Sequence, residues 1–208
     1  MENPWKTIPL GDYEGHMRLS SVRQLQTLNT LMRGQLACFP VESVMILGVA
    51  GGNGLEHADK EKYRKIYGVD VNADYLAEAR RRFPELDGVL ECVCLDLRTE
   101  ADRLPRAELV IADLLVEYIG CEAFRNVIRH VAPRYLSCVI QKNESAAWVS
   151  DSPYLHAFDG LESVHTEIDA QTLTDSLHEI GFRLIDTQTV PLPNGKALQR
   201  LDFTAGAG

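Results

Sequence analysis

Positive charge is scarce in this sequence. Its 208 residues include 21 Lys and Arg against 30 Asp and Glu, which gives a formal net charge of −9. A nucleic-acid backbone would meet a repulsive field over most of such a surface. The one basic run, Arg80-Arg81-Arg82, stands at the end of a predicted helix, where cations complement the helix dipole. We therefore expect no nucleic-acid partner.

Long apolar runs are also missing. No stretch approaches the ~20 uninterrupted apolar residues that a membrane-spanning helix needs. The first residues, Met1 to Lys6, do not follow the charged-then-apolar pattern of a signal peptide. We therefore expect a cytoplasmic protein with no membrane partner.

Cysteine is sparse and scattered. No two of the five cysteines have the spacing of a zinc knuckle. We therefore expect neither a disulfide scaffold nor a structural zinc site. Cys92 and Cys94 stand two apart on a predicted strand, and we predict that their thiols are buried and reduced.

Apolar residues, in contrast, make up 45% of the chain, against only 15 Gly and 9 Pro. That composition is typical of a chain that buries a substantial core, and the length predicts a single domain over residues 1–208.

Short apolar runs alternate with helical patterns along the chain. Apolar residues spaced three to four apart predict a helix from Val22 to Leu36. The predicted strands cover residues 44–47, 66–71, 89–97, 109–115, 136–141, 183–190 and 197–204. Later helices are predicted to end near Phe83, to cover 122–131 and to run from 169 to 180, and Asn194-Gly195 marks a hairpin between the last two strands. This order predicts an α/β fold: a doubly wound, mostly parallel seven-stranded sheet with an antiparallel last strand and helices on both faces.

A glycine-rich turn, residues 48–54, follows the first predicted strand. Glycines let a ligand approach the backbone closely, and a helix expected to start near Leu55 would offer free N–H groups to an anion. Asp70 ends the second strand about 20 positions later, where doubly wound folds hydrogen-bond a ribose diol. Asp96 and Asp113 stand at the ends of the third and fourth strands. Because the carboxyl ends of parallel strands meet at one edge of the sheet, these residues predict a nucleotide-like ligand there.

A nicotinamide enzyme is one alternative, because Gly48, Gly52 and Gly54 have the spacing of the cofactor turn in short-chain dehydrogenases. That family also needs a Tyr-x-x-x-Lys pair, in which the lysine lowers the tyrosine pKa. No tyrosine here has a lysine four residues on, and the sequence has no Gly-x-Gly-x-x-Gly. We therefore expect that NAD does not bind.

The order of these motifs resembles class I S-adenosylmethionine-dependent methyltransferases, from the N-terminal helix to the C-terminus. Val44 to Gly54 resembles the first motif of that family, Gly68 to Asn72 its ribose-binding acid, Cys94 to Leu97 its adenine contact and Ala112 to Leu115 its fourth-strand motif. The resemblance implies S-adenosylmethionine as cofactor, with residues 1–43 as an N-terminal cap segment and helix, 44–141 as the cofactor-binding half, and 142–208 as a lid loop, a helix and a C-terminal hairpin. The implied cofactor-binding residues are Gly48, Ala50, Gly51, Gly52, Gly54, Asp70, Val71, Asn72, Asp96, Leu97 and Asp113.

Two positions depart from the family pattern. The family usually has an acidic residue where Gly48 stands and a glycine where Ala50 stands. The group that contacts the methionine amino end therefore stays open, with Glu56 or an N-terminal residue as alternatives.

The resemblance further implies methyl transfer to a small-molecule acceptor by direct displacement, for which alignment and water exclusion matter most. In similar enzymes the segment before the first helix folds over the cofactor, and here Asp12 to Met17 contains Tyr13 and His16. Glu117, just past the fourth strand, stands where similar enzymes place acceptor-facing groups. Tyr13, His16 and Glu117 are therefore the catalytic candidates. Residues 142–168 show no clean period but carry Trp148, Tyr154, His156 and Phe158, which predicts a lid.

Two further alternatives stay open at this point. Magnesium at Asp113, Asn143 and Glu144, or a transition metal at His156, Asp159 and His165, has a weak pattern, and we expect no metal. A non-catalytic relative that binds adenosylmethionine or its product as a sensor or partner subunit would share every cofactor motif.

Overall fold

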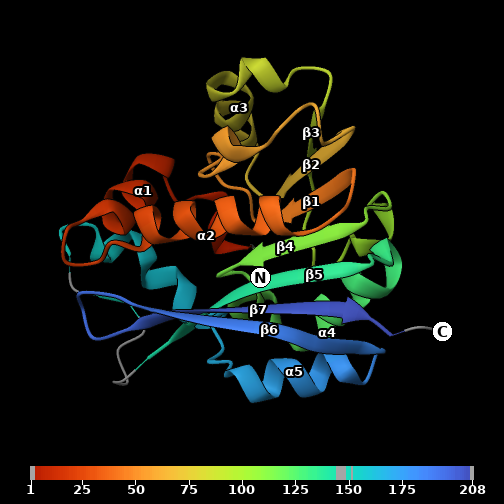
Figure 1. Ribbon diagram of the computed structural model, residues 1–208. Coiled ribbons are helices and arrows are strands. Elements are labelled where there is room, and N and C mark those ends of the chain that lie inside the picture. The colour runs from red at the N-terminus through yellow and green to blue at the C-terminus, as the bar shows by residue number, and fades with distance from the viewer. Residues whose placement is uncertain (1–2, 144–148, 151, 207–208) are drawn as a thin grey trace.

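One seven-stranded sheet forms the centre of the fold (Figure 1). The computed structural model describes residues 3–143, 149–150 and 152–206. The strands are β1 Ser43–Leu47, β2 Lys65–Asp70, β3 Leu90–Cys94, β4 Leu109–Asp113, β5 Tyr135–Lys142, β6 Phe182–Pro191 and β7 Ala197–Ala205. Their order in the sheet is β3-β2-β1-β4-β5-β7-β6. Strands β1 to β5 pair in parallel, whereas β7 is antiparallel to both β5 and β6. The predicted fold class is thereby confirmed.

Helices cover both faces of this sheet (Figure 1). The α-helices are α1 Leu10–Arg18, α2 Gln24–Cys38, α3 Ala73–Arg82, α4 Val116–Val131 and α5 Ala170–His178. Short 3₁₀ helices are η1 Pro4–Lys6, η2 Leu55–His57, η3 Pro84–Leu86, η4 Ala101–Arg103 and η5 Leu155–Ser163. No helix in these described parts of the chain is long and apolar enough to cross a membrane.

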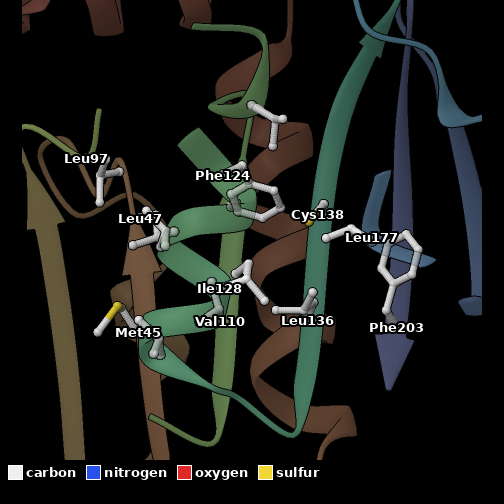
Figure 2. Close-up of a cluster of buried hydrophobic side chains, with 14 of the residues drawn as sticks. Met45, Leu47, Leu97, Val110, Phe124, Ile128, Leu136, Cys138, Leu177 and Phe203 are labelled. Carbon is white, nitrogen blue, oxygen red and sulfur yellow. The ribbon is translucent and has the colours of Figure 1, made fainter. Parts of the chain in front are cut away.

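Strand β1 shows how one apolar run serves two cores. Val44 and Ile46 point to the face covered by α2 and α3, whereas Met45 and Leu47 point to the face covered by α4. Figure 2 shows the second face, where Phe124 of α4 packs among strand residues. Because side chains alternate along a strand, a strand buried on both faces needs a continuous apolar run. The parallel strands therefore present their carboxyl ends, rather than their faces, to ligands.

The last two strands form the predicted hairpin. Gly195 in the connecting turn has φ +78°, a left-handed angle that suits glycine. The Leu192 N–H donates to the Lys196 carbonyl at 2.8 Å and closes the turn. The Asn-Gly signal thus marks the right position.

The structure corrects the helix predicted to start near Leu55. Only the three-residue η2 follows the glycine turn, so no α-helix N-terminus faces a ligand there. The turn is closed locally instead, since the Gly54 N–H donates to a Glu56 carboxylate oxygen at 3.0 Å. Asn29 of α2 holds the other oxygen of Glu56, at 2.5 Å. Backbone N–H groups of this turn are thus satisfied within the protein.

Other boundaries also differ from the prediction. Residues 12–17, expected to precede the first helix, lie inside α1. Strand β3 ends at Cys94 rather than at residue 97, and α4 begins at Val116 rather than at residue 122. The predicted lid contains η5, and Glu144 and Trp148 lie outside the described residues. All five cysteines are free, but the predicted burial of Cys92 and Cys94 is wrong: Cys94 is exposed and Cys92 is half-buried, because β3 is an edge strand of the sheet.

Candidate active site

The carboxyl edge of the sheet encloses a cavity that we call the edge cavity. Asp70 and Asp113 are the last residues of β2 and β4, and Asp96 follows β3 by two residues. All three line this cavity together with Gly48 and Ala50 from the turn after β1, as the prediction from strand order required. The cavity holds about 670 Å³ of space free of protein atoms, including space open to solvent. A mostly apolar lining with a few converging polar groups is typical of a small-molecule site.

The glycine turn and Asp70 are joined by hydrogen bonds. The Ala50 N–H donates to Asp70 Oδ2 at 2.9 Å, and the Asn72 N–H donates to Asp70 Oδ1 at 2.9 Å. Burial raises the pKa of Asp70, and these hydrogen bonds oppose the rise. Ala50 itself has φ +46°, a left-handed angle that costs an L-residue with a side chain about 1–2 kcal/mol. The family preference for glycine at this position therefore has a visible cause in the backbone.

The other predicted cofactor residues divide into two groups. Val71 and Leu97 line the edge cavity, whereas Gly51, Gly52, Gly54 and Asn72 are not among the described residues that line it. Asn72 caps α3, because its side-chain oxygen accepts from the Asp74 N–H at 3.0 Å. A Cβ at Gly52 would lie 2.7 Å from the Phe83 ring, so the glycine allows close packing of the turn against the end of α3.

An N-terminal cover, residues 3–18, crosses the edge cavity. Asn3 Nδ2 donates to Asp96 Oδ2 at 3.0 Å, and Asn72 Nδ2 donates to the Trp5 carbonyl at 3.0 Å. The Tyr75 hydroxyl donates to the Ile8 carbonyl at 2.9 Å. These bonds tie the N-terminal cover to the ends of β2 and β3. Asn3, Trp5 and Tyr13 of the cover line the edge cavity as well.

A second cavity, which we call the aromatic cavity, adjoins the first. Trp5, Tyr13, Leu114 and Tyr118 line both. The Trp5 ring stands edge-on to Tyr13, with centroids 5.7 Å apart, and to Tyr118 at 5.0 Å. The aromatic cavity holds about 560 Å³ of space free of protein atoms, including space open to solvent. Ligands bound in the two cavities would therefore lie next to each other, with these shared side chains around the junction.

Each cavity contains one carboxyl group with an unused oxygen. Asp113 in the edge cavity accepts from Gln35 Nε2 at 2.8 Å, and Glu117 in the aromatic cavity accepts from the Gln141 N–H at 2.9 Å. The second oxygen of each, Asp113 Oδ2 and Glu117 Oε2, is buried without a hydrogen-bond partner among the described residues. Burial raises the pKa of each to about 7. An unsatisfied buried polar atom is unfavourable, so a hydrogen-bond donor on a ligand would stabilise either oxygen.

The three catalytic candidates lie together in the aromatic cavity. Tyr13, His16 and Glu117 all line it. His16 Nδ1 lies 2.8 Å from Ser152 Oγ, and burial lowers the pKa of His16. Burial, with a smaller contribution from the Asp70 charge, raises the pKa of the Tyr13 phenol. A neutral imidazole and a neutral phenol therefore face this cavity near pH 7.

A break in α4 aims Glu117 and Tyr118 at the site. Gly120 has φ +77° and ψ 157°, so Val116–Ile119 form a separate first turn ahead of the core-packing helix. The preceding Leu114 has φ +52°, a left-handed angle at a non-glycine residue. Such strained angles gather at functional sites, where the surrounding structure holds them.

Sequence reasoning missed several residues of the site. Trp5 and Gln141 line the aromatic cavity, and Gln35 reaches Asp113 from α2. Of the predicted lid, Phe158 and His165 line the cavity, whereas His156 is exposed and contacts Asp159 at 3.3 Å. Asn143 lines a different hollow, and among the described residues no group of three His, Cys, Asp or Glu could hold a metal ion.

No protein-family model matches the chain, and no curated protein sequence matches it. Solved structures do match in fold. Magnesium protoporphyrin IX methyltransferase (ChlM) from Synechocystis PCC 6803 with bound SAH has a TM-score of 0.71 at 14% identity, over 97% of this chain and 96% of that one. N-methyltransferase NodS from Bradyrhizobium japonicum WM9 in complex with S-adenosyl-L-homocysteine has a TM-score of 0.69 at 14% identity, over 99% of this chain and 100% of that one.

The [4+2]-cyclase SpnF also matches, with a TM-score of 0.67 at 15% identity, over 92% of this chain and 85% of that one. The chain thus has the fold of the class I S-adenosylmethionine-dependent methyltransferases. Since a fold can carry more than one reaction, the function has to be argued from the two cavities.

Proposed function

We propose that this protein transfers a methyl group from S-adenosylmethionine to a small-molecule acceptor. The observation that carries the proposal is the edge cavity, where Asp70, Asp96 and Asp113 converge beside a left-handed turn. The fold supports the same function, since ChlM and NodS are methyltransferases. An acidic chain and an enclosed aromatic cavity favour a small acceptor over nucleic acid.

The residues of the edge cavity fit the cofactor from end to end. Asp70 is held by two backbone N–H groups, which leaves lone pairs free for the two ribose hydroxyls. Asp96 and Leu97 suit the adenine. Gly48 has no carboxyl group for the methionine end of the cofactor. Strand β4, which pairs with β1, supplies Asp113 instead, whose Oδ2 has no partner among the described residues and suits the α-ammonium group.

The remaining cofactor candidates complete this binding site. Ala50 and Val71 line the cavity wall. Gly51, Gly52, Gly54 and Asn72 hold the turn and the start of α3 in the shape that positions Asp70.

When bound, the cofactor supplies a methyl group already activated on a sulfonium. The protein's task is then to align the acceptor with that methyl group and to exclude water. Trp5, Tyr13 and Tyr118 do both, because they line the junction of the two cavities. His16 and Glu117 face the acceptor from the other walls of the aromatic cavity.

Calorimetry with S-adenosylhomocysteine and NAD tests the proposal. We expect S-adenosylhomocysteine to bind and NAD not to bind. Asp70→Ala should weaken S-adenosylhomocysteine binding by roughly 1.5–3 kcal/mol, the scale of hydrogen bonds to a charged group. Asp74→Ala, an exposed aspartate in the first turn of α3, is the matched control and should leave the affinity unchanged.

Two results would contradict the proposal. Micromolar NAD binding with no response to S-adenosylhomocysteine would exclude the cofactor. Tight S-adenosylhomocysteine binding, with no methyl transferred from S-adenosylmethionine to any of a broad set of small acceptors, would favour the non-catalytic sensor instead.

A further inference from the structure

The aromatic cavity contains an acid that the protein leaves half satisfied. Glu117 is only 4% exposed, and its Oε1 is held by the Gln141 N–H at 2.9 Å. Oε2 is buried and has no hydrogen-bond partner among the described residues. Burying such an oxygen is unfavourable unless a donor pairs with it. The cavity therefore requires a donor from its ligand.

The walls around Glu117 favour one kind of donor. Trp5, Tyr13, Tyr118 and Phe158 line the cavity, and their ring faces attract cations. No Lys or Arg is among the described residues that line it. Lys196 lies near enough for its charge to lower the pKa of His16 and His165, but it does not belong to the lining. An anionic ligand would meet Glu117 with no Lys or Arg among the described lining residues, whereas an ammonium group would meet a carboxylate and aromatic rings.

We infer that the aromatic cavity takes an amine acceptor, a primary or secondary ammonium next to an apolar group, and that Glu117 holds the ammonium and accepts its proton. This inference rests on the proposed methyl transfer and adds the substrate class and the role of Glu117. It makes Glu117 a catalytic residue, because its carboxylate touches the reacting nitrogen.

The proton and charge balance of the reaction closes with these groups. The ammonium R–NH₃⁺ gives one proton to the Glu117 carboxylate and becomes R–NH₂, whose lone pair attacks the methyl carbon. The N–C bond forms as the S–C bond breaks, and the bonding pair stays on sulfur as the neutral thioether. The products are R–NH₂⁺–CH₃ and a protonated Glu117, so the net charge is +1 before and after. The proton then leaves Glu117 when the product departs.

The electrostatics of the cavity suit this exchange. Burial raises the pKa of Glu117 to about 7, which makes its carboxylate a stronger proton acceptor than an exposed one. Among the described residues, the titratable groups that line the cavity beside it are Tyr13 and His16 from α1, Tyr118 from its own turn, and His165. Asp113 lies in the adjoining cavity, and the charge of Lys196 reaches both imidazoles. Burial raises the pKa of both phenols and lowers the pKa of both imidazoles, so these four groups are neutral near pH 7.

Binding of a matched pair of probes tests the inference. Phenethylammonium and the neutral 2-phenylethanol are titrated by calorimetry into the protein saturated with S-adenosylhomocysteine. We expect phenethylammonium to bind at least about tenfold tighter than the alcohol, because only the amine can form a charge-assisted hydrogen bond with Oε2. Its affinity should fall about tenfold between pH 8 and pH 6, as a carboxyl group with a pKa of about 7 becomes protonated.

Glu117→Gln isolates the carboxylate. Gln keeps an oxygen for the Gln141 N–H, so the local fold is expected to survive, with S-adenosylhomocysteine affinity within about twofold of the wild type. The variant should lose at least about tenfold of its phenethylammonium affinity and the pH dependence of that binding, while 2-phenylethanol stays unchanged. Glu122→Gln, an exposed glutamate on the same helix, should behave as the wild type.

The outcomes distinguish failure of the proposed methyl transfer from failure of the amine inference. Failure of the wild type to bind S-adenosylhomocysteine overturns the proposed function. Normal S-adenosylhomocysteine binding with equal affinities for the amine and the alcohol, or with an amine affinity that Glu117→Gln leaves unchanged, overturns the amine inference alone.

Discussion

Arg82 at the end of α3 grips Glu14 of α1 with two contacts, Nη1 to Oε1 at 2.5 Å and Nη2 to Oε2 at 3.1 Å. The Glu14 side chain is buried, and Arg82 also contacts the Gly51 carbonyl at 3.3 Å. One guanidinium thus joins the N-terminal cover, the glycine turn and α3. The basic run is a structural feature, as predicted, since Arg81 and Arg82 also pair with Glu78.

Glu14→Gln should loosen the N-terminal cover. The variant removes the charge that Arg82 holds, and breaking a mostly buried pair costs about 1–2 kcal/mol here, because Arg82 is partly exposed. Hydrogen exchange of the amides in α1 should accelerate about 5- to 30-fold. Arg81→Ala, at an exposed arginine of the same run, should leave these rates unchanged, and equal rates in Glu14→Gln would show that the pair does not hold the cover.

Ala50→Gly should stabilise the protein by about 0.5–1 kcal/mol. Glycine relieves the left-handed strain at φ +46°, although it adds some entropy to the unfolded chain. The opposite sign is expected for Ala77→Gly on the exposed side of α3, where glycine lowers helix propensity by about 1 kcal/mol. Urea denaturation measures both. A loss of stability in Ala50→Gly would contradict the strain argument.

Gly52→Val should lower stability by more than about 2 kcal/mol. Its Cβ would lie 2.7 Å from Phe83 and 2.9 Å from Leu55, and φ +87° is itself unfavourable for a β-branched residue. Gly88→Val separates the two effects, since Gly88 has φ +82° but no atom within 4 Å of its added Cβ. A melting temperature as high for Gly52→Val as for Gly88→Val would show that the turn at Gly52 accommodates the added side chain without packing strain.

The contribution of Asp113 to stability should fall as the pH rises from about 4 to 7. Asp113 has a pKa of about 7 in the folded protein against roughly 4 when unfolded, so the folded state binds the extra proton in this window. That contribution is fully present at the acid end and is lost as the pH passes the folded pKa. Each such group gives at most about 1.4 kcal/mol per pH unit, and Glu117 acts with the same sign.

Asp113→Asn tests this assignment of the pH dependence. The amide keeps an oxygen for Gln35 but cannot titrate, so the slope of unfolding free energy against pH should become more positive between pH 4 and 7. Asp102→Asn, at an exposed position in η4, is the control with an unchanged slope. A slope as steep in Asp113→Asn as in the wild type would mean that Asp113 is charged throughout.

The parallel strands and their common carboxyl edge could be predicted because they depend on local pattern. Strands β1 and β4 are buried apolar runs, and an aspartate at or just past the end of a strand, as at Asp70 and Asp113, falls at the edge wherever the strands pair in parallel. The hairpin at Gly195 is equally local, since the turn type itself demands a left-handed angle.

The features that sequence reasoning missed are set by contacts between distant segments. Helix α1 contains Gly11 and Gly15, which lower helix propensity, yet the absent Cβ at Gly15 lets the Tyr154 ring approach to within 3 Å of the Cβ position. Gln35 meets Asp113 across 78 positions in the chain. The hydrophobic periodicity of the sequence does not predict such distant pairs, so Trp5 and Gln35 could not be assigned to the site from the sequence.

The interruption at Gly120 divides α4 into a part constrained by core packing and a part that faces the ligand cavities. Beyond it, Phe124, Val127 and Ile128 are locked into the core, where a change of one methyl group is felt in stability. Before it, Val116 is still buried in the core, but Glu117, Tyr118 and Ile119 line the ligand cavities, and a Cβ added at Gly120 would touch nothing. Substitutions at residues 117–119 can therefore change which acceptor fits without changing the packing of the helix beyond Gly120. A related chain could then differ in its substrate while keeping the same fold.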